Sequence, residues 1–145
     1  IRSRRQRQMC IRDSHKSYQT SLFIMSNSET VRTLLKMFES FNVEGFLELL
    51  TEDAEYRFGN YPAAVGQENI AATIKASHLD AISGISFEIK SLYELEDTVV
   101  TELICNYTLK KGGNLPLPCL DIFKFQGGKV SAMLVFMDAT PLFTA

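Results

Sequence analysis

Residues 117–138, with the sequence LPCLDIFKFQGGKVSAMLVFMD, carry the strongest structural signal in the chain. Two runs rich in β-branched and aromatic residues flank Gly127 and Gly128, and a glycine pair adopts positive φ at little cost. The pattern predicts two antiparallel strands joined by a two-residue turn. We expect this hairpin to close an antiparallel sheet, on which the rest of the chain packs.

A two-residue turn sets the strand register, because Gln126 must then face Lys129. The expected pairs are Phe125 with Val130, Phe123 with Ala132, Asp121 with Leu134, and Cys119 with Phe136. Side chains alternate across a sheet, so these residues should share one face. Asp121 is the one charge on that apolar face, and a buried charge either finds a partner or stays protonated. Asp121 is therefore our first candidate functional residue.

The opposite face of the hairpin is also apolar. We expect it to carry Leu120, Ile122, Met133, Val135 and Met137, with Lys124 and Ser131. Such a face should not meet water. We expect a second copy of the chain to cover this face in a homodimer. The alternative is that the C-terminal stretch 141–143 folds over it.

Composition narrows the classes of protein. The 145 residues suit one domain, and no apolar run approaches the roughly 20 residues that span a bilayer. Three cysteines without CxxC spacing argue against a disulfide framework or zinc site and favour a reducing, cytoplasmic compartment. We find no phosphate-binding glycine loop and no metal-spaced cluster. We therefore expect no metal, no cofactor and no membrane partner.

Residues 1–24 differ from the remainder. They hold six basic residues against the single acid Asp13, and they resemble translated sequencing-adapter DNA. We expect a non-native or disordered leader over 1–24 and one domain over 25–145; a basic arm for nucleic acid is the alternative. Subtracting these seven residues from the totals of 15 and 17 leaves nine basic and 16 acidic residues, a formal charge of −7. So acidic a domain argues against a nucleic-acid partner.

The remaining elements are predicted from periodicity and capping. Ser26 and Glu29 have capping-box spacing before a helix, and Asn42 is a cap candidate for a second one. Residues 54–58 alternate as a strand, a third helix is expected from 66 to about 81 with Gly84 as its stop, and strands follow. Helices on one face of a mainly antiparallel sheet make an α+β fold.

Three motifs then stand in order: NVEGFLELLTEDA at 42–54, VGQENI at 65–70 and LDIFKFQGGKV at 120–130. Together they resemble the SnoaL-like branch of the nuclear transport factor 2-like superfamily, over nearly all of residues 25–145. The resemblance implies a cystatin-like cone in which three N-terminal helices pack on a curved sheet around an apolar cavity. The superfamily hosts many activities, so the resemblance predicts the fold better than the function.

By its place before the Gly-Gly turn, Asp121 matches the oxyanion-hole acid of ketosteroid isomerases. The other isomerase residues are missing. The general base would fall near Arg57 or Phe58, and the tyrosine near Leu34 or Leu35. The resemblance therefore implies an apolar ligand beside Asp121, but not the known isomerase mechanism.

The remaining candidates are ranked by where periodicity places them. His78 shares a helical face with Ile70 and Ile74 and is a possible catalytic partner of Asp121, or else a hydrogen-bonded residue at the core edge. Arg57 is expected either to hold a ligand inside the cone or to lie solvated outside it. The expected substrate contacts are Arg57, Tyr56, Phe123, Leu134 and Phe136.

Two hypotheses follow. In the first, the protein is a cofactor-independent isomerase, cyclase or lyase that acts on a small apolar carbonyl compound through Asp121. In the second, it is a non-catalytic module that binds an apolar small molecule or a protein. A homodimer through the sheet is compatible with both, and the sequence leaves open whether the protein is an enzyme.

Overall fold

The computed structural model describes residues 24–144, apart from the side chains of residues 78 and 79. The expected leader therefore lies outside the described residues, except for Ile24. The elements in chain order are α2 (Asn27–Glu39), α3 (Val43–Glu48), β1 (Leu50–Phe58), β2 (Ala64–Val65), α4 (Gln67–Ile74), the π-helix η1 (Lys75–Leu79), β3 (Ile82–Leu95), β4 (Thr98–Leu109), β5 (Asn114–Gln126), β6 (Lys129–Phe136) and α5 (Thr140–Thr144).

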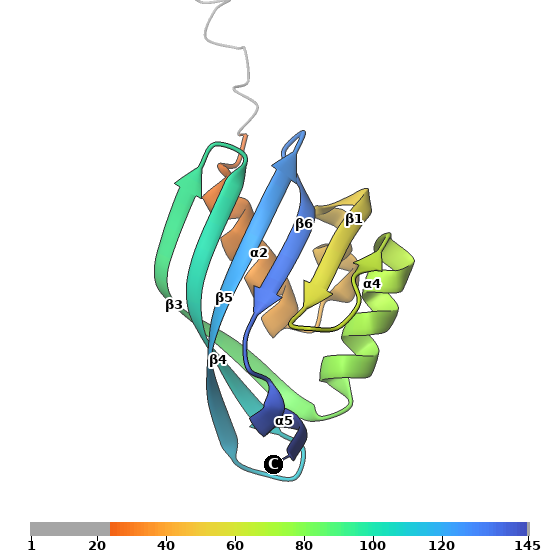
Figure 1. The fold of residues 1–145 in the computed structure, drawn as a ribbon, viewed down its shortest axis with the longest axis vertical. Helices are drawn as coiled ribbons and strands as arrows, with labels where there is room; N and C mark the ends of the chain where they lie inside the picture. The colour runs from red at the N-terminus through yellow and green to blue at the C-terminus, as the bar shows by residue number, and fades with distance from the viewer. Residues whose placement is uncertain (1–23, 145) are drawn as a thin grey trace, which may run out of the picture.

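One six-stranded sheet organises the molecule, in the order β2-β1-β6-β5-β4-β3. Every pair is antiparallel except β1 and β6, which run parallel. Figure 1 shows α2 behind the bent sheet, α4 beside β1 and α5 at the lower end of the sheet. The predicted α+β cone with N-terminal helices on a curved, mainly antiparallel sheet is confirmed.

Helix α2 begins where the sequence predicts. The Ser26 hydroxyl accepts the backbone N–H of Glu29, and the Glu29 carboxylate accepts the backbone N–H of Ser26, which completes a capping box. Val31, Leu34 and Leu35 on one side of the helix are buried against the sheet. Leu34 and Leu35 of this apolar stripe face the same cavity as Asp121.

The central hairpin forms with the predicted turn but not with the predicted register. Gly127 and Gly128 have φ values of 59° and 79°, and Gln126 pairs with Lys129. Val130 pairs with Phe125, yet Ala132 pairs with Lys124, so Ser131 is an extra residue, a β-bulge. Beyond Ser131 every side chain changes face relative to the prediction.

Because of the bulge, the β6 residues on each face of the hairpin differ from those predicted. Asp121 lies opposite Val135 instead of Leu134, and Met133 and Val135 point inward. Leu134 and Phe136 therefore lie on the outer face, where Phe136 is 45% exposed. The prediction that they share a face with Asp121 was wrong, because a bulge shifts the alternation by one residue.

Gly84 was also assigned wrongly. It lies in β3 and does not stop the third helix, which continues from α4 into η1 and ends at Leu79. A Cβ at position 84 would lie 3.3 Å from the Thr108 hydroxyl of the neighbouring strand. Close approach of β3 and β4 thus explains the glycine.

Candidate functional site

Asp121 is buried on the inner face of the sheet. It lies on β5 between Thr101 of β4 and Val135 of β6, and it is 2% exposed. It borders a cavity whose other walls are Leu34, Leu35, Phe38, Tyr56, Phe58, Ile85, Phe87, Cys105, Tyr107, Cys119, Met133, Val135 and Met137. The space open to the centre of a water-sized sphere is about 20 Å³, which is room for about one water molecule.

Burial sets the charge state of Asp121. The Cys119 thiol donates a hydrogen bond to Asp121 Oδ1 over 3.1 Å, and neither ion pair found among the described residues involves this carboxyl. Burial raises the pKa of Asp121 to about 7, and the bond from Cys119 lowers it in part. The carboxyl group is therefore divided between its neutral and ionised forms near neutral pH.

Two tyrosines share the cavity with Asp121. Burial, together with the nearby Asp121 carboxyl, raises the pKa of Tyr56, and burial followed by Cys105 raises the pKa of Tyr107. Both rings therefore stay neutral phenols with a hydroxyl to donate. The Tyr107 hydroxyl donates to Met137 Sδ over 3.7 Å. Tyr56, predicted to contact substrate, lies in the cavity wall.

Two free thiols, Cys105 and Cys119, also line the cavity. A hydrogen bond with Cys105 and then burial raise the pKa of Cys119, so this thiol stays protonated. Our sequence reasoning placed Cys119 on the face of Asp121 but gave it no role. The signal was available, because residues two apart in a strand share a face.

The other predicted site residues are dispersed. Phe123 is fully buried in the core on the face of Asp121 but is not part of the cavity wall. Arg57 lies on the outer face, opposite Leu134, with its guanidinium carbon 5.9 Å from the centre of the Phe136 ring. The structure thus gives Arg57, Leu134 and Phe136 no access to the cavity. The side chain of His78, in η1, lies outside the described residues.

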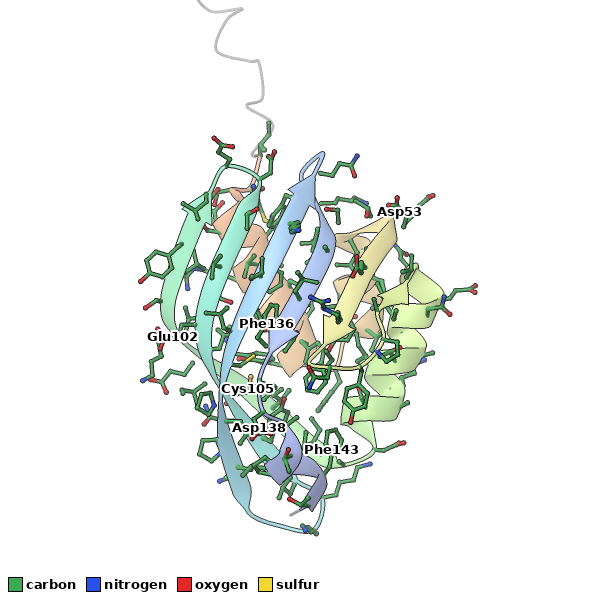
Figure 2. The ribbon with its side chains drawn as sticks, in the orientation of Figure 1. Asp53, Glu102, Cys105, Phe136, Asp138 and Phe143 are labelled. Carbon is green, nitrogen blue, oxygen red and sulfur yellow. The ribbon has the colours of Figure 1, made fainter. Side chains whose placement is uncertain are left out.

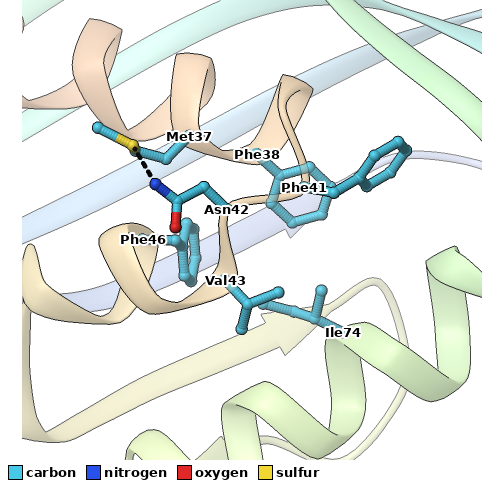
Figure 3. Close-up of a pocket in the computed structure, with 7 residues that line it drawn as sticks. All are labelled: Met37, Phe38, Phe41, Asn42, Val43, Phe46 and Ile74. Atoms are coloured by element: carbon cyan, nitrogen blue, oxygen red, sulfur yellow. Dashed lines mark hydrogen bonds between the residues drawn. The ribbon is translucent and has the colours of Figure 1, made fainter.

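A second small cavity lies between the helices (Figure 3). Its walls are Met37, Phe38, Phe41, Asn42, Val43, Phe46 and Ile74, none of which is titratable. The Asn42 side chain donates to Met37 Sδ over 3.3 Å and accepts the backbone N–H of Gly45 over 2.9 Å. These contacts join α2 to α3, and this cavity offers no chemistry comparable to that around Asp121.

The described residues show neither a metal site nor a membrane-spanning helix. Among the described side chains, no three His, Cys, Asp or Glu groups converge well enough to hold a metal ion. None of the described helices is long and apolar enough to cross a bilayer.

The family follows from a direct match. Residues 31–133 match the family model described as the SnoaL-like domain. The chain belongs to this family. A search of curated protein sequences finds no significant match to this SnoaL-like chain.

Solved structures share the fold at low sequence identity. A nuclear transport factor 2-like protein of unknown function from Burkholderia pseudomallei matches with a TM-score of 0.75 and 18% identity, over 83% of this chain and 97% of that one. A protein with a ketosteroid isomerase-like fold from Catenulispora acidiphila, in complex with trimethylamine, gives 0.72 and 16%, over 82% and 92%. A protein assigned as a SnoaL-like polyketide cyclase from Shewanella denitrificans gives 0.70 and 13%, over 81% and 93%. At these identities the likeness establishes the fold alone.

Proposed function

We propose that this SnoaL-like protein binds a small apolar carbonyl compound beside Asp121 and moves a proton on it without a cofactor. The observation that carries the proposal is a buried carboxyl group whose pKa is raised to about 7 within apolar walls. A proton carrier works best when its pKa lies near the working pH. Asp121 meets that condition.

The proposed reaction is a proton transfer α to a carbonyl group. Ionised Asp121 takes a proton from the α-carbon, the C–H electron pair moves into the enolate, and the carbonyl oxygen gains charge. A phenol of Tyr56 or Tyr107 donates a hydrogen bond to that oxygen, because both pKa values are raised and both hydroxyls keep their protons. Neutral Asp121 then returns the proton to the same carbon or to another one.

The cavity beside Asp121 is too small for an ordinary ligand, so side chains in its wall must move to admit one. Space for about one water molecule is far below the several hundred Å³ of an ordinary ligand pocket. Met133 and Met137 form part of the wall, and methionine side chains repack easily. We propose that the ligand enters by displacing these side chains, because the cavity is too small to hold it otherwise.

The test uses exchange of α-hydrogens for deuterium, which needs no knowledge of the final product. Cyclohex-2-enone and a panel of polycyclic ketones are incubated with the full chain in D₂O and followed by ¹H NMR. We expect faster exchange for some ketones and background exchange in Asp121→Asn. Asp138→Asn is the control, because Asp138 is exposed. Exchange at the full rate in Asp121→Asn, or no acceleration for any ketone, would contradict the proposal.

The non-catalytic alternative is favoured by one observation, the small volume of the cavity beside Asp121. In that case ligand binding survives in Asp121→Asn and Asp121→Leu, no exchange occurs, and Asp121→Leu raises stability because it removes a buried carboxyl group. The same exchange experiment therefore separates the two functions.

We also propose a homodimer in the cytoplasm. The outer face of the sheet keeps Leu120 at 39% and Phe136 at 45% exposure, so α5 does not cover it. An apolar surface of this kind supports a contact with a second copy of the chain. Cys105 and Cys119 are free thiols, as expected in a reducing compartment.

A further inference from the structure

Thr101 places a hydroxyl without a partner next to the buried acid. Its side chain is fully buried on the inner face of β4, and its Oγ1 makes no hydrogen bond with any described residue. Thr101 lies directly opposite Asp121 in the β4–β5 pair. Opposite side chains on one face have Cβ atoms about 5 Å apart, so rotation of χ1 brings Oγ1 within reach of the carboxyl group.

The first oxygen of Asp121 already has a donor. The Cys119 thiol donates to Oδ1 over 3.1 Å, while Oδ2 accepts no hydrogen bond from the described residues. Because Cys119 remains protonated, this donor is present at every pH at which Asp121 titrates. The proton of neutral Asp121 therefore belongs on Oδ2, and it is Oδ2 that lacks a donor when the proton leaves.

We infer that Thr101 is a positioning residue for Asp121, whose hydroxyl turns to donate to Oδ2 when Asp121 ionises. An ionised carboxylate offers only acceptors, and a buried one needs donors on both oxygens. A hydroxyl left without any partner is costly to bury, and a role in one charge state explains why it is kept. The inference rests on the proposed role of Asp121 as a proton carrier.

The residues around Asp121 leave hydrogen-bond donors as the main means of stabilising its ionised form. The described titratable groups that face Asp121 are Tyr56 on β1, Cys105 and Tyr107 on β4, and Cys119 on β5. The cavity walls from α2, β3 and β6 are apolar. Tyr56, Tyr107 and Cys119 have raised pKa values and stay neutral. None of these groups supplies a counter-charge, so hydrogen-bond donors must stabilise the ionised form.

The experiment measures the pKa of Asp121 directly in the full chain. Protein labelled with ¹³C at aspartate Cγ is titrated by NMR, and the Asp121 signal is assigned by its absence in Asp121→Asn. Thr101→Val replaces the hydroxyl with a methyl group at nearly constant shape. Thr51→Val is the matched control, since Thr51 Oγ1 is the other buried hydroxyl without a partner among the described residues. Cys119→Ala and Cys119→Ser test the fixed donor.

We expect Thr101→Val and Cys119→Ala each to raise the pKa of Asp121 by about 0.5 to 1. Cys119→Ser should restore it in part, and Thr51→Val should leave it unchanged. Thr101→Val should also stabilise the fold at pH 5, where Asp121 is neutral, and stabilise it less at pH 8. If Thr101→Val does not fold, Thr101→Ala and Thr101→Ser take its place, and only the alanine variant should raise the pKa.

Two results would overturn the inference. The first is an unchanged Asp121 pKa in Thr101→Val, with a stability gain that is the same at both pH values. The second is an equal rise in Thr51→Val, which would indicate general loosening of the core. A raised pKa in Thr101→Val without any ketone exchange would support the role of Thr101 and remove the proposed function, so the two failures are distinguishable.

Discussion

At the scale of single residues, folding makes the carboxyl group of Asp121 a much weaker acid. The pKa of Asp121 rises from an ordinary 3.8 to about 7 because the inner face of the sheet excludes water. Between these values the folded protein holds a proton that the unfolded chain has released. Stability is therefore full below pH 4 and is lost as the pH rises towards 7.

This sign gives the first prediction. Wild-type protein should lose about 3 kcal/mol of unfolding free energy between pH 5 and pH 8 through Asp121. Asp121→Asn should abolish this loss, because an amide does not ionise. Urea denaturation at both pH values measures it. Asp138→Asn should keep the loss, since Asp138 is exposed and a hydrogen bond from Thr140 lowers the pKa of Asp138. An equal pH dependence in wild type and Asp121→Asn would refute the buried-acid account.

The sequence predicts the burial of Asp121 but not its neighbours. Alternation along one strand is a local property, and it places Cys119, Asp121 and Phe123 on one face correctly. The donors from β4 depend on which strand lies beside β5 and in which register. Thr101 and Tyr107 could not be assigned to the site until the pairing of β4 with β5 was known.

At the scale of elements, the Asn42 side chain links the end of α2 to the start of α3. A Cβ on Gly45 would lie 2.6 Å from Asn42 Nδ2 and 3.0 Å from Met37 Sδ. Helix propensity alone predicts that Gly45→Ala stabilises by about 1 kcal/mol. We expect a net loss of about 1 kcal/mol instead, because the methyl group displaces the Asn42 cap.

A double-mutant cycle tests this explanation. In an Asn42→Ala background the nearer obstacle is gone and the remaining one, Met37 Sδ, belongs to a flexible side chain, so Gly45→Ala should become stabilising. Chemical denaturation of the four proteins gives the coupling. Additive effects would mean that the cap and the methyl group do not compete.

The end of α2 carries a different kind of strain. Phe41 has a φ of 55°, and its N–H and that of Asn42 bond back to Phe38 and Met37, as in a glycine-ended helix. A Cβ in this conformation costs about 1 kcal/mol or more. Phe41→Gly should therefore be about 1 kcal/mol more stable than Phe41→Ala in urea denaturation, although both lose the ring. Equal stabilities would show that the backbone is not strained.

The hairpin shows where element prediction from sequence fails. The Gly127–Gly128 turn and both strands were predicted correctly, because turn residues and β propensity are local. The bulge at Ser131 was not, since Ser-Ala is compatible with regular strand as well. One extra residue moved Leu134 and Phe136 from the expected cavity to the outer face, so a small local error changed two site residues.

At the scale of the whole molecule, the cone is predicted by element order, but its interior is not. The motifs around residues 42–54 and 120–130 determine which layers form. The volume left between them depends on how side chains such as Phe38, Phe87 and Met137 fill the cavity, which only packing decides. The expected hollow interior is therefore reduced to a cavity of about 20 Å³ in this structure.

The outer face gives the prediction that involves the whole surface. Leu120 lies on this face between Glu102 of β4 and Phe136 of β6, and Figure 2 labels both of these neighbours. In a twofold dimer the same patch meets itself. The wild-type chain should therefore sediment at twice its mass of 16.3 kDa.

Leu120→Glu should yield folded monomer, because in a twofold dimer it would bury two like charges against each other without a partner. Leu95→Glu is the matched control, since Leu95 is 63% exposed at the end of β3 and should leave the dimer intact. A monomeric wild type would mean that no second copy covers this face. A dimer that survives Leu120→Glu would mean that the two copies meet through another surface.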